Sequence, residues 1–485
     1  MTDQDTICAV STPPGTGAIA VIRISGPSSY PVMSEIFRNA NDKQVNLKNR
    51  PAGSVVYGRI YDGDEVLDEV VITLFKSPHS YTGEDTIEIS CHGSVFIQQT
   101  ILNLLSSKGI RPADRGEYTM RAFMNGKMDL SQAEAVADLI VSHSAAARRV
   151  ALQQMRGGFS RDIAEMRAGL VSFMALIELE LDFSEEDVQF ADRSGLMEHV
   201  SILGSAITRL MESYRAGNVL KDGIPVVIAG RPNTGKSTLL NVLLNEEKAI
   251  VTDVAGTTRD VIEDTILISD ILFRITDTAG LRKTEDPVES IGISRTYEKI
   301  DKASILLYLV DAVNIFENGI NAVVKELDML LEKNPLLSGG VLFLIITKSD
   351  LYDTEIMQGI TDKVYSITNE ATGAAARYPF VIKTIPVSAP AGYGMDKLKE
   401  TLCDIARRDI PPANETIVTN ARHFAALQNA SGSLARVYEG LASGISGDFL
   451  AQDIREVLHY LGGITGEVVN DEVLGEVFGR FCIGK

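Results

Sequence analysis

Short runs rich in hydrophobic residues in the first quarter of the chain have the pattern of β-strands, and the spacing then becomes helical. The strand-like runs are 18–24, 55–61, 66–75 and 86–90, and the last of them alternates between apolar and polar residues. Asp62-Gly63 lies between the two middle runs, which predicts a β-hairpin with its turn at that dipeptide. From Ser94 to Ser107 the apolar residues recur every three or four positions, which predicts a helix. Residues 1–124 are therefore predicted to form an α+β domain.

Two later regions, 125–217 and 411–485, show helical spacing over most of their length. The apolar stripes are Met166, Leu170, Phe173, Ile177 and Leu181 in the first region, and Leu450, Ile454, Val457 and Leu461 in the second. We expect the second stripe to end at Gly462-Gly463. We also expect Asn470 to cap the helix that follows.

Residues 218–410 separate the helical regions and are predicted to form an α/β domain of the P-loop, Ras-like class. The segment is longer than a minimal domain of that class, so we expect surface insertions near 314–340 and 352–378. Pro411-Pro412 marks its end. The insertion leaves either one discontinuous helical domain or two separate bundles. We favour the first, because the ends of a domain usually lie close together.

The segment Gly230-Arg-Pro-Asn-Thr-Gly-Lys-Ser-Thr238 follows a strand-like run and precedes a helical pattern. This order is what a phosphate-binding P-loop requires. Its glycines let backbone N–H groups face phosphate oxygens at a helix N-terminus, where the dipole favours anions. Lys236 is placed to reach the β- and γ-phosphates, and Ser237 to coordinate Mg²⁺. The expected nucleotide contacts are Asn233, Thr234, Gly235, Lys236, Ser237 and Thr238.

Three further motifs indicate that the nucleotide is GTP and that the chain hydrolyses it. In Asp277-Thr278-Ala279-Gly280, the aspartate can hold Mg²⁺ through water, and the glycine N–H can reach the γ-phosphate. Asp350, in Thr347-Lys348-Ser349-Asp350, is placed to accept from guanine N1–H and the exocyclic amine. The backbone N–H groups of Ser388-Ala389 can face guanine O6.

Two of these motifs depart from the usual GTPase pattern. Thr347 stands where an asparagine usually braces the base-binding loop, so a lower affinity for guanine is expected while Asp350 keeps the discrimination. Pro390 stands where a lysine usually covers the base.

The groups that would assist hydrolysis are also unusual. Leu281 and Arg282 follow Gly280, and neither can orient a water as glutamine does in many small GTPases. Glu289 is our candidate for that role, the alternative being a solvated carboxylate. The amide of Asn233 either helps to coordinate a monovalent cation that neutralises developing charge, or only caps the loop.

Length and composition limit the class of protein. A chain of 485 residues should hold two to four domains. A formal net charge of −19 and a pI near 4.9 argue against wholesale coating of a nucleic acid. The four cysteines show no metal-binding spacing, no apolar run is long enough for a membrane span, and the acidic start is not a signal peptide. A reduced, cytoplasmic setting is expected.

Short motifs along essentially the whole chain resemble those of the MnmE (TrmE) family of tRNA modification GTPases. They are Asp5-Thr-Ile7, Thr12-Pro-Pro-Gly15, Arg23-Ile-Ser-Gly26, Tyr81-Thr-Gly-Glu-Asp85, Cys91-His-Gly93, Arg121-Ala-Phe-Met-Asn-Gly-Lys127, Gly256-Thr-Thr-Arg-Asp260 and Phe481-Cys-Ile-Gly-Lys485. The resemblance implies a folate-binding-like N-terminal domain that forms a homodimer, and GTP hydrolysis stimulated by K⁺-dependent pairing of G domains. It implies action with the flavoprotein MnmG, as a heterotetramer, on the C5 position of the tRNA wobble uridine. The one-carbon unit would come from 5-formyl- or 5,10-methylene-tetrahydrofolate.

The resemblance also implies roles for individual residues. Folate contacts would be Arg23, Glu84, Lys127 and Lys485, whose charges suit a pterin edge and a glutamate tail. Ser237 and Thr258 would hold Mg²⁺, while Asn233, Thr252, Thr257 and the backbone of Val254 would hold K⁺. Glu289 would orient the attacking water. Cys482 would act as a nucleophile or protect an intermediate, or else be a small buried hydrophobe.

Two questions stay open at this point. The arginines Arg148, Arg149, Arg156, Arg161 and Arg167 either contact tRNA phosphates or, as we favour, form a solvated helix face. The chain is either a GTPase coupled to folate-dependent tRNA modification or a regulatory or assembly GTPase that uses GTP only as a switch. The folate-like segment and the Cys-Ile-Gly-Lys terminus favour the first function. A stand-alone folate aminomethyltransferase does not explain a complete GTPase domain.

Overall fold

The computed structural model describes residues 5–182, 193–247, 263–277, 300, 303–319, 321–323, 325, 341–370, 382–408 and 415–484. The chain divides into two compact units, each made of segments far apart in the sequence. The first unit combines 1–140, 152–200 and 432–485, and the second combines 141–151 with 201–431.

The first unit contains a seven-stranded sheet with the strand order β3-β4-β5-β6-β2-β1-β7. Its strands are β1 (Ile7–Val10), β2 (Ile19–Ser25), β3 (Phe37–Asn39), β4 (Val55–Asp62), β5 (Glu65–Phe75), β6 (Thr86–His92) and β7 (Arg111–Pro112). The four strands expected from the strand-like runs are confirmed to within two residues. Neighbouring strands are antiparallel except β1 and β7, which are parallel.

The expected β4–β5 hairpin is present, but its turn lies one residue further along than predicted. Asp62 pairs with Glu65 across the ladder, so the turn is Gly63-Asp64. Gly63 has a φ of 60°, a left-handed conformation that costs glycine little, and this places it inside the turn while Asp62 remains in the strand.

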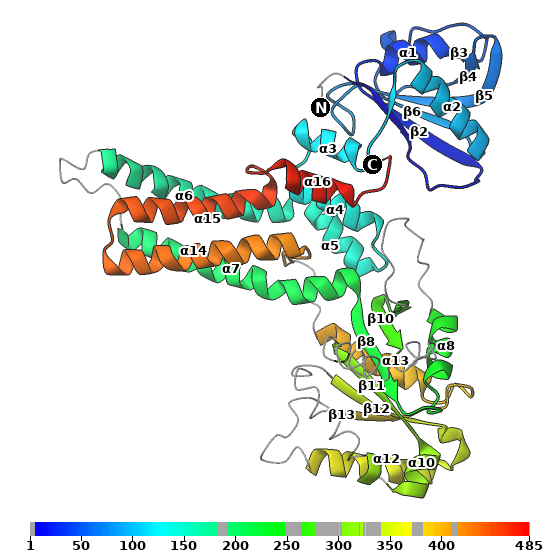
Figure 1. Ribbon diagram of the computed structural model, residues 1–485, viewed down its shortest axis with the longest axis vertical. Helices are drawn as coiled ribbons and strands as arrows, with labels where there is room; N and C mark the ends of the chain where they lie inside the picture. The colour runs from blue at the N-terminus through cyan, green and yellow to red at the C-terminus, as the bar shows by residue number, and fades with distance from the viewer. Residues whose placement is uncertain are drawn as a thin grey trace, which may run out of the picture. The chain divides into compact units, whose positions relative to one another are not determined.

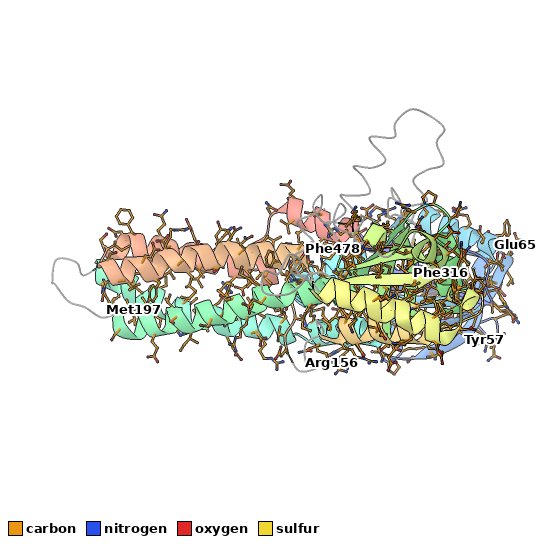
Figure 2. All side chains as sticks on the ribbon, turned by 90° about the horizontal axis from the view of Figure 1, so that it is seen from below. Tyr57, Glu65, Arg156, Met197, Phe316 and Phe478 are labelled. Carbon is orange, nitrogen blue, oxygen red and sulfur yellow. The ribbon has the colours of Figure 1, made fainter. Side chains whose placement is uncertain are left out.

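Two helices, α1 (Ser29–Ile36) and α2 (Val95–Ser107), cover one face of this sheet (Figure 1). Met33 of α1 and Leu105 of α2 are fully buried in the same core as Ile22 and Ile89 from the strands. Burying alternate strand residues in this way leaves the intervening ones, such as Tyr57 and Arg23, on the opposite face of the sheet (Figure 2 labels Tyr57).

Eight further helices of the described chain flank a second sheet, formed by β8 to β13, in the sequence. They are α3 (Glu117–Met124), α4 (Leu130–Ile140), α5 (Ala145–Met155), α6 (Gly158–Asp182), α7 (Arg193–Asp222), α14 (Ala421–Ser443), α15 (Gly447–Thr465) and α16 (Asp471–Gly479). In the first unit, α6 packs along α15, and α3 packs against α16, so segments from both sides of the second sheet meet there (Figure 1). The boundaries predicted for the domains stay a prediction.

In the first expected helical stripe Leu170 and Ile177 are buried while Met166 and Phe173 are half-buried, and the second stripe is buried with one correction to where its helix ends. Leu450, Ile454, Val457 and Leu461 are all fully buried. However, α15 continues through Gly462-Gly463 and ends at Thr465, and the next residue, Gly466, has a φ of 88°. Gly466 also lies so close to Phe123 and Leu130 that a Cβ would clash with both side chains. The C-terminus of α15 is therefore determined by the left-handed Gly466 and not by Gly462-Gly463.

Asn470 caps α16 as predicted, because its side chain accepts a hydrogen bond from the backbone N–H of Val473 over 2.9 Å. The helix then buries Val477 and Phe478 against Leu130. Among the helices in the described ranges, none is both long and apolar enough to cross a bilayer.

The second unit contains a six-stranded sheet in the order β13-β12-β11-β8-β10-β9. Its strands are β8 (Ile224–Gly230), β9 (Glu263–Ile268), β10 (Ile271–Asp277), β11 (Ile305–Asp311), β12 (Val341–Thr347) and β13 (Ile382–Pro386). All neighbouring pairs are parallel except β9 and β10. This is the predicted P-loop α/β class.

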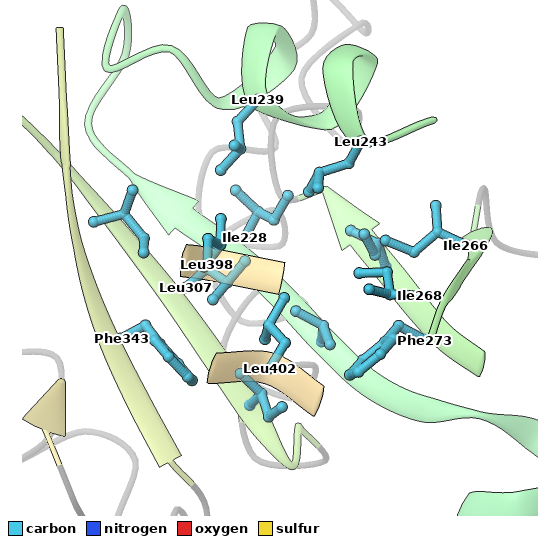
Figure 3. Packing of buried hydrophobic residues seen from close by; sticks show 14 of the residues in the cluster. Ile228, Leu239, Leu243, Ile266, Ile268, Phe273, Leu307, Phe343, Leu398 and Leu402 are labelled. Atoms are coloured by element: carbon cyan, nitrogen blue, oxygen red, sulfur yellow. The ribbon is translucent and has the colours of Figure 1, made fainter. Parts of the chain in front are cut away.

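Helices cover both faces of this sheet. On one face, Leu239 and Leu243 of α8 (Lys236–Glu247) and Leu398 and Leu402 of α13 (Met395–Arg408) pack on the strands (Figure 3). On the other face lie α10 (Ala312–Asn318) and α12 (Thr354–Glu370).

The region 352–378 is thus not a simple surface insertion, because part of it forms α12 and buries Met357 against the sheet. Much of the other expected insertion, 314–340, and the Pro411-Pro412 boundary lie outside the described residues.

Candidate nucleotide site and N-terminal polar site

The P-loop segment joins β8 to α8, which is the strand–loop–helix order expected from the sequence. Asn233 and Gly235 have φ values of 64° and 86°, so the chain curls tightly between strand and helix. The Lys236 amine is nearly buried and donates to the main-chain oxygens of Gly230 and Arg231, over 2.9 and 2.7 Å. Its ammonium group is therefore held over the loop, where β- and γ-phosphates would accept from it.

Thr347 at the end of β12 is bound to this loop. Its hydroxyl lies 2.8 Å from the main-chain oxygen of Thr234 and 3.2 Å from that of Val310, and the side chain is buried. A hydroxyl at this position therefore braces the phosphate loop. No sequence pattern indicates this bond, because it joins residues 113 positions apart. The lower affinity for guanine expected from the missing asparagine stays a prediction.

The two loops expected to read guanine lie side by side. The N–H of Ser349 donates to the oxygen of Val387 over 3.4 Å, and Lys348, with a φ of 56°, forms an ion pair with Asp311. Asp350 is exposed, so its carboxylate is accessible to a nucleobase.

The hydroxyls of Ser349 and Ser388 are buried and have no hydrogen-bond partner among the described residues. The backbone N–H of Ser388 donates to the oxygen of Tyr393 over 2.9 Å, which takes it away from the expected contact with guanine O6. Of the Ser388-Ala389 pair, Ala389 is left as the candidate for that contact.

Other predicted positions lie at the edge of the described ranges or outside them. Asp277 ends β10 as expected, but only its backbone is described. Thr252, Val254, Thr257, Thr258, Thr278, Ala279, Gly280, Glu289 and Lys485 lie outside the described residues. Ser237 and Thr238 lie in the first turn of α8 with exposed side chains, and Asn233 is exposed in the loop before it.

A second polar site lies in the first unit, around the loop 78–84. Arg23, on β2, donates to Glu88 over 2.8 Å, and its guanidinium lies 5.3 Å from the ring centre of Tyr81. Lys127 donates to the main-chain oxygen of Pro78 over 2.9 Å. With Glu84 inside the loop, the structure brings three of the four predicted folate residues to one segment.

Glu84 is held on two sides by residues that the sequence analysis did not single out. Ser25 Oγ donates to Glu84 Oε2 over 2.7 Å, and Arg121 Nη1 lies 3.2 Å from Glu84 Oε1. Each of these residues belongs to one of the motifs quoted for the family resemblance, so a signal was present. The spacing of the motifs along the chain did not show that they meet.

Arg121 also belongs to a network of charged side chains around the buried carboxylate of Glu117. It contacts Asp5 over 2.6 Å and Glu117 over 2.9 Å, and Arg111 bridges the same two carboxylates. Burial opposes ionisation of Glu117, but hydrogen bonds from Arg111 and Arg121 outweigh it and hold the pKa of Glu117 below its usual value. The same balance lowers the pKa of Asp5. Both carboxylates thus stay charged and fix Arg121 beside Glu84.

The C-terminal tail lies against this same domain. Ser11 Oγ donates to the main-chain oxygen of Gly484 over 3.1 Å, and Arg115 and Ile483 form an isolated β-bridge. Gly484 has a φ of 95°, and a Cβ there would lie 2.2 Å from the oxygen of Val10. Cys482 is exposed and unpaired to any other cysteine, so the predicted alternative of a buried hydrophobe is wrong.

The other cysteines are buried. Burial raises the pKa of the Cys8 thiol to about 11, and burial together with the charge of Asp68 raises that of Cys91 to about 11. Within the described part of the chain, no cluster of histidine, cysteine and acidic side chains has the arrangement of a metal site.

The arginines noted in the sequence are mostly exposed on helices. Arg148, Arg149, Arg156 and Arg161 are exposed, and Arg156, labelled in Figure 2, lies in the turn between α5 and α6. Arg167 differs, since it forms an ion pair with Glu467. Whether any of them contacts RNA stays a prediction.

Comparison with known proteins gives consistent results along the chain. Residues 6–127 match the model of the GTP-binding protein TrmE N-terminus, and residues 130–482 match that of the MnmE helical domain. A tRNA modification GTPase MnmE from Flavobacterium johnsoniae is 48% identical over 485 residues, covering 100% of both chains. The corresponding protein of Bacteroides fragilis is 49% identical over 484 residues, again covering 100% of both.

Similarity to solved structures is much weaker. The G domain of the T. maritima FeoB iron transporter is 22% identical and is matched over 98% of its length and 38% of this chain, with a TM-score of 0.23.

Proposed function

The chain belongs to the MnmE family of tRNA modification GTPases, and from that premise we propose that it couples GTP hydrolysis to one-carbon modification of the tRNA wobble uridine. The reaction would place an aminomethyl-type group on C5 of that base. The observation that carries the proposal is that one chain contains both a P-loop and a polar site around residues 78–84. The C-terminal tail lies against the domain that contains this polar site. A GTPase used only as a switch needs neither the polar site nor the tail.

The nucleotide half of the proposal assigns ordinary roles to the P-loop residues. Lys236 binds the β- and γ-phosphates, and the hydroxyls of Ser237 and Thr258 would be ligands of Mg²⁺. Asp350 discriminates guanine from adenine by accepting from its N1–H and amine. Glu289 orients the attacking water as the hydrolytic step requires.

A monovalent cation completes the charge neutralisation in this proposal. The exposed amide of Asn233 fits this task, because the left-handed residue projects from the loop that cradles the phosphates. Thr252, Thr257 and the oxygen of Val254 would supply the other oxygen ligands for K⁺. A bound K⁺ would supply the positive charge that an arginine finger provides in other GTPases.

The one-carbon half of the proposal uses the residues around loop 78–84. The carboxylate of Glu84, fixed by Ser25 and Arg121, would accept from the donor edge of a pterin. Lys127 and Lys485 would bind the glutamate tail of a tetrahydrofolate such as the 5-formyl or 5,10-methylene derivative. Arg23 contributes a fixed positive charge, since Glu88 and Tyr81 already hold its guanidinium. Cys482 is accessible for a nucleophilic or protective role.

We also propose the assembly in which these halves act. Two copies of the chain pair through their N-terminal domains and bind the flavoprotein MnmG as a heterotetramer in the cytoplasm. tRNA is the substrate of the complex, and exposed arginines such as Arg156 offer contacts to its phosphates.

The experiment that tests the proposal is nucleoside analysis of tRNA from a strain that lacks this chain. We expect the C5-modified wobble uridine to disappear and to return when the chain is supplied, while a Glu84→Gln variant restores it poorly. Titration of the purified chain with 5-formyl-tetrahydrofolate provides the direct binding measurement. Unchanged wobble uridines in the deletion strain would favour the switch GTPase instead.

A further inference from the structure

The turn between β9 and β10 has an unusual backbone. Ile268 pairs with Ile271, so Ser269 and Asp270 form a two-residue turn, and their φ values are 46° and 67°. Turns with two positive φ angles strongly favour Asn-Gly, because a Cβ is strained in that conformation. A Ser-Asp pair in this position indicates that the side chains have a use that outweighs the strain.

The Asp270 side chain caps a helix that is 125 residues away in the sequence. Its Oδ1 accepts from the backbone N–H of Ala145 over 2.8 Å, at the first position of α5. Ser144 Oγ accepts from the N–H of Ala147 over 3.0 Å, so the helix also has a local cap. A carboxylate at a helix N-terminus is favoured by the helix dipole as well as by the hydrogen bond.

A second contact of the same hairpin, between Leu272 and Gly223, links it to the segment that follows α7. Gly223, with a φ of 83°, lies between α7 and β8, and a Cβ there would lie 3.0 Å from both Cγ and the oxygen of Leu272. Leu220, at the end of α7, packs with Val150 of α5 and Ile417. The hairpin therefore contacts α5 and the residue that joins α7 to β8.

The other end of the hairpin adjoins a motif that is predicted to contact the nucleotide. Glu263 pairs with Thr276, and β10 then ends at Asp277 of the Asp-Thr-Ala-Gly motif. In the sequence, β9 follows the segment that contains Gly256-Thr-Thr-Arg-Asp260. Six paired residues span about 20 Å, so this pair of strands extends from the residue that begins the Asp-Thr-Ala-Gly motif to the turn that contacts α5.

We propose that Asp270 is a positioning residue that ties the switch strands to α5, so that the nucleotide bound at the P-loop alters the stability of that helix. The contact is made by the Asp270 carboxylate and the Ala145 N–H. It extends the nucleotide-dependent role proposed above and rests on nucleotide binding by this chain.

The test compares backbone amide exchange in α5 with GDP and with a non-hydrolysable GTP analogue bound. Two variants remove the contact from opposite sides. Asp270→Gly removes the carboxylate and relaxes the turn, and Ala145→Pro removes the donor at a helix position where proline is well tolerated. Ser269→Gly is the matched control, because it relaxes the same turn and keeps Asp270.

In the wild type and in Ser269→Gly we expect the exchange rate of α5 amides to differ by about threefold or more between the two nucleotides. Both contact variants should lose this difference, and the double variant should behave like each single one, because the two residues form one interaction. GTP turnover should stay within about twofold in the absence of tRNA.

Two results would overturn the proposal: no nucleotide dependence of α5 in the wild type, or an undiminished dependence in either contact variant. Nucleotide binding is measured separately with a fluorescent GDP. A wild-type chain that binds no nucleotide would contradict the proposed GTPase function itself, so the two failures are distinguishable.

Discussion

The hydroxyl of Thr347 donates to the main-chain oxygen of Thr234, 2.8 Å away, so the strand that ends at the proposed guanine-binding motif holds the P-loop directly. The two halves of the proposed nucleotide site are therefore linked by a hydrogen bond. The same hydroxyl lies 3.2 Å from the oxygen of Val310, which links the loop to the neighbouring strand as well.

Removing this hydroxyl should weaken nucleotide binding. Thr347→Val keeps the shape of the side chain, but it leaves the Thr234 oxygen without its partner. An unsatisfied buried group costs about 1–3 kcal/mol, so we expect GDP affinity to fall by about tenfold in a fluorescence titration. Thr347→Ser is the control and should bind almost as the wild type does. Equal affinity of the valine variant would show that the bond does not support the site.

Asp350 should determine the choice of base. Asp350→Asn replaces an acceptor by a group that can donate, which suits the oxygen of xanthine in place of the guanine amine. We expect the variant to prefer XTP over GTP in competition binding, with its fold unchanged by circular dichroism. Retained preference for GTP would place the base elsewhere.

Features that depend on residues close together in the chain could be predicted from the sequence, whereas contacts between distant segments could not. Asn470 was correctly predicted as a cap and the P-loop as a strand–loop–helix, because both depend on residues close together in the chain. The end of α15 was predicted wrongly, since two glycines in the pattern precede the one that takes a left-handed conformation.

The missed site residues are all long-range partners. Ser25 lies 59 positions from Glu84, and Ser11 lies 473 positions from Gly484, so no spacing rule connects them. Periodicity reports which face of an element is buried, but it does not report which other segment covers that face. This is why the residues of the candidate site were identified more readily than the contacts that hold them.

GTP turnover should depend on the monovalent cation. If K⁺ beside Asn233 neutralises charge in the transition state, replacing K⁺ by Na⁺ at equal ionic strength should slow turnover by about tenfold or more. Asn233→Ala should have a low rate in both salts. The rate is measured as phosphate release. Equal rates of the wild type in K⁺ and Na⁺ would exclude this role for Asn233.

The cysteines should react with iodoacetamide at very different rates. Thiolate is the reactive form, and burial raises the pKa of Cys8 and Cys91 to about 11, so at neutral pH both remain protonated as well as inaccessible. Cys482 is exposed, and Cys403 is buried.

We therefore expect mass spectrometry to show one labelled cysteine in the native protein and four after unfolding. Cys482→Ser should abolish the native label. Rapid labelling of Cys8 below pH 9 would contradict the protonated, buried state assigned to it.

Gly169 should be required for the packing of α6 on α7. A Cβ at this position would lie 2.0 Å from Nε2 of His199, and that ring also contacts Phe173. Overpacking of this kind costs about 1–3 kcal/mol and opposes the gain of about 0.5–1 kcal/mol that alanine brings to a helix. Gly169→Ala should thus lower the unfolding midpoint measured by circular dichroism by a few degrees.

Gly432→Ala, in the open middle of α14, is the matched control and should leave the midpoint unchanged or raise it. Adding His199→Ala to Gly169→Ala should recover part of the loss, because it removes the ring with which the new methyl group collides. A midpoint for Gly169→Ala equal to that of the control would show that the His199 ring turns away from the new methyl group at little cost.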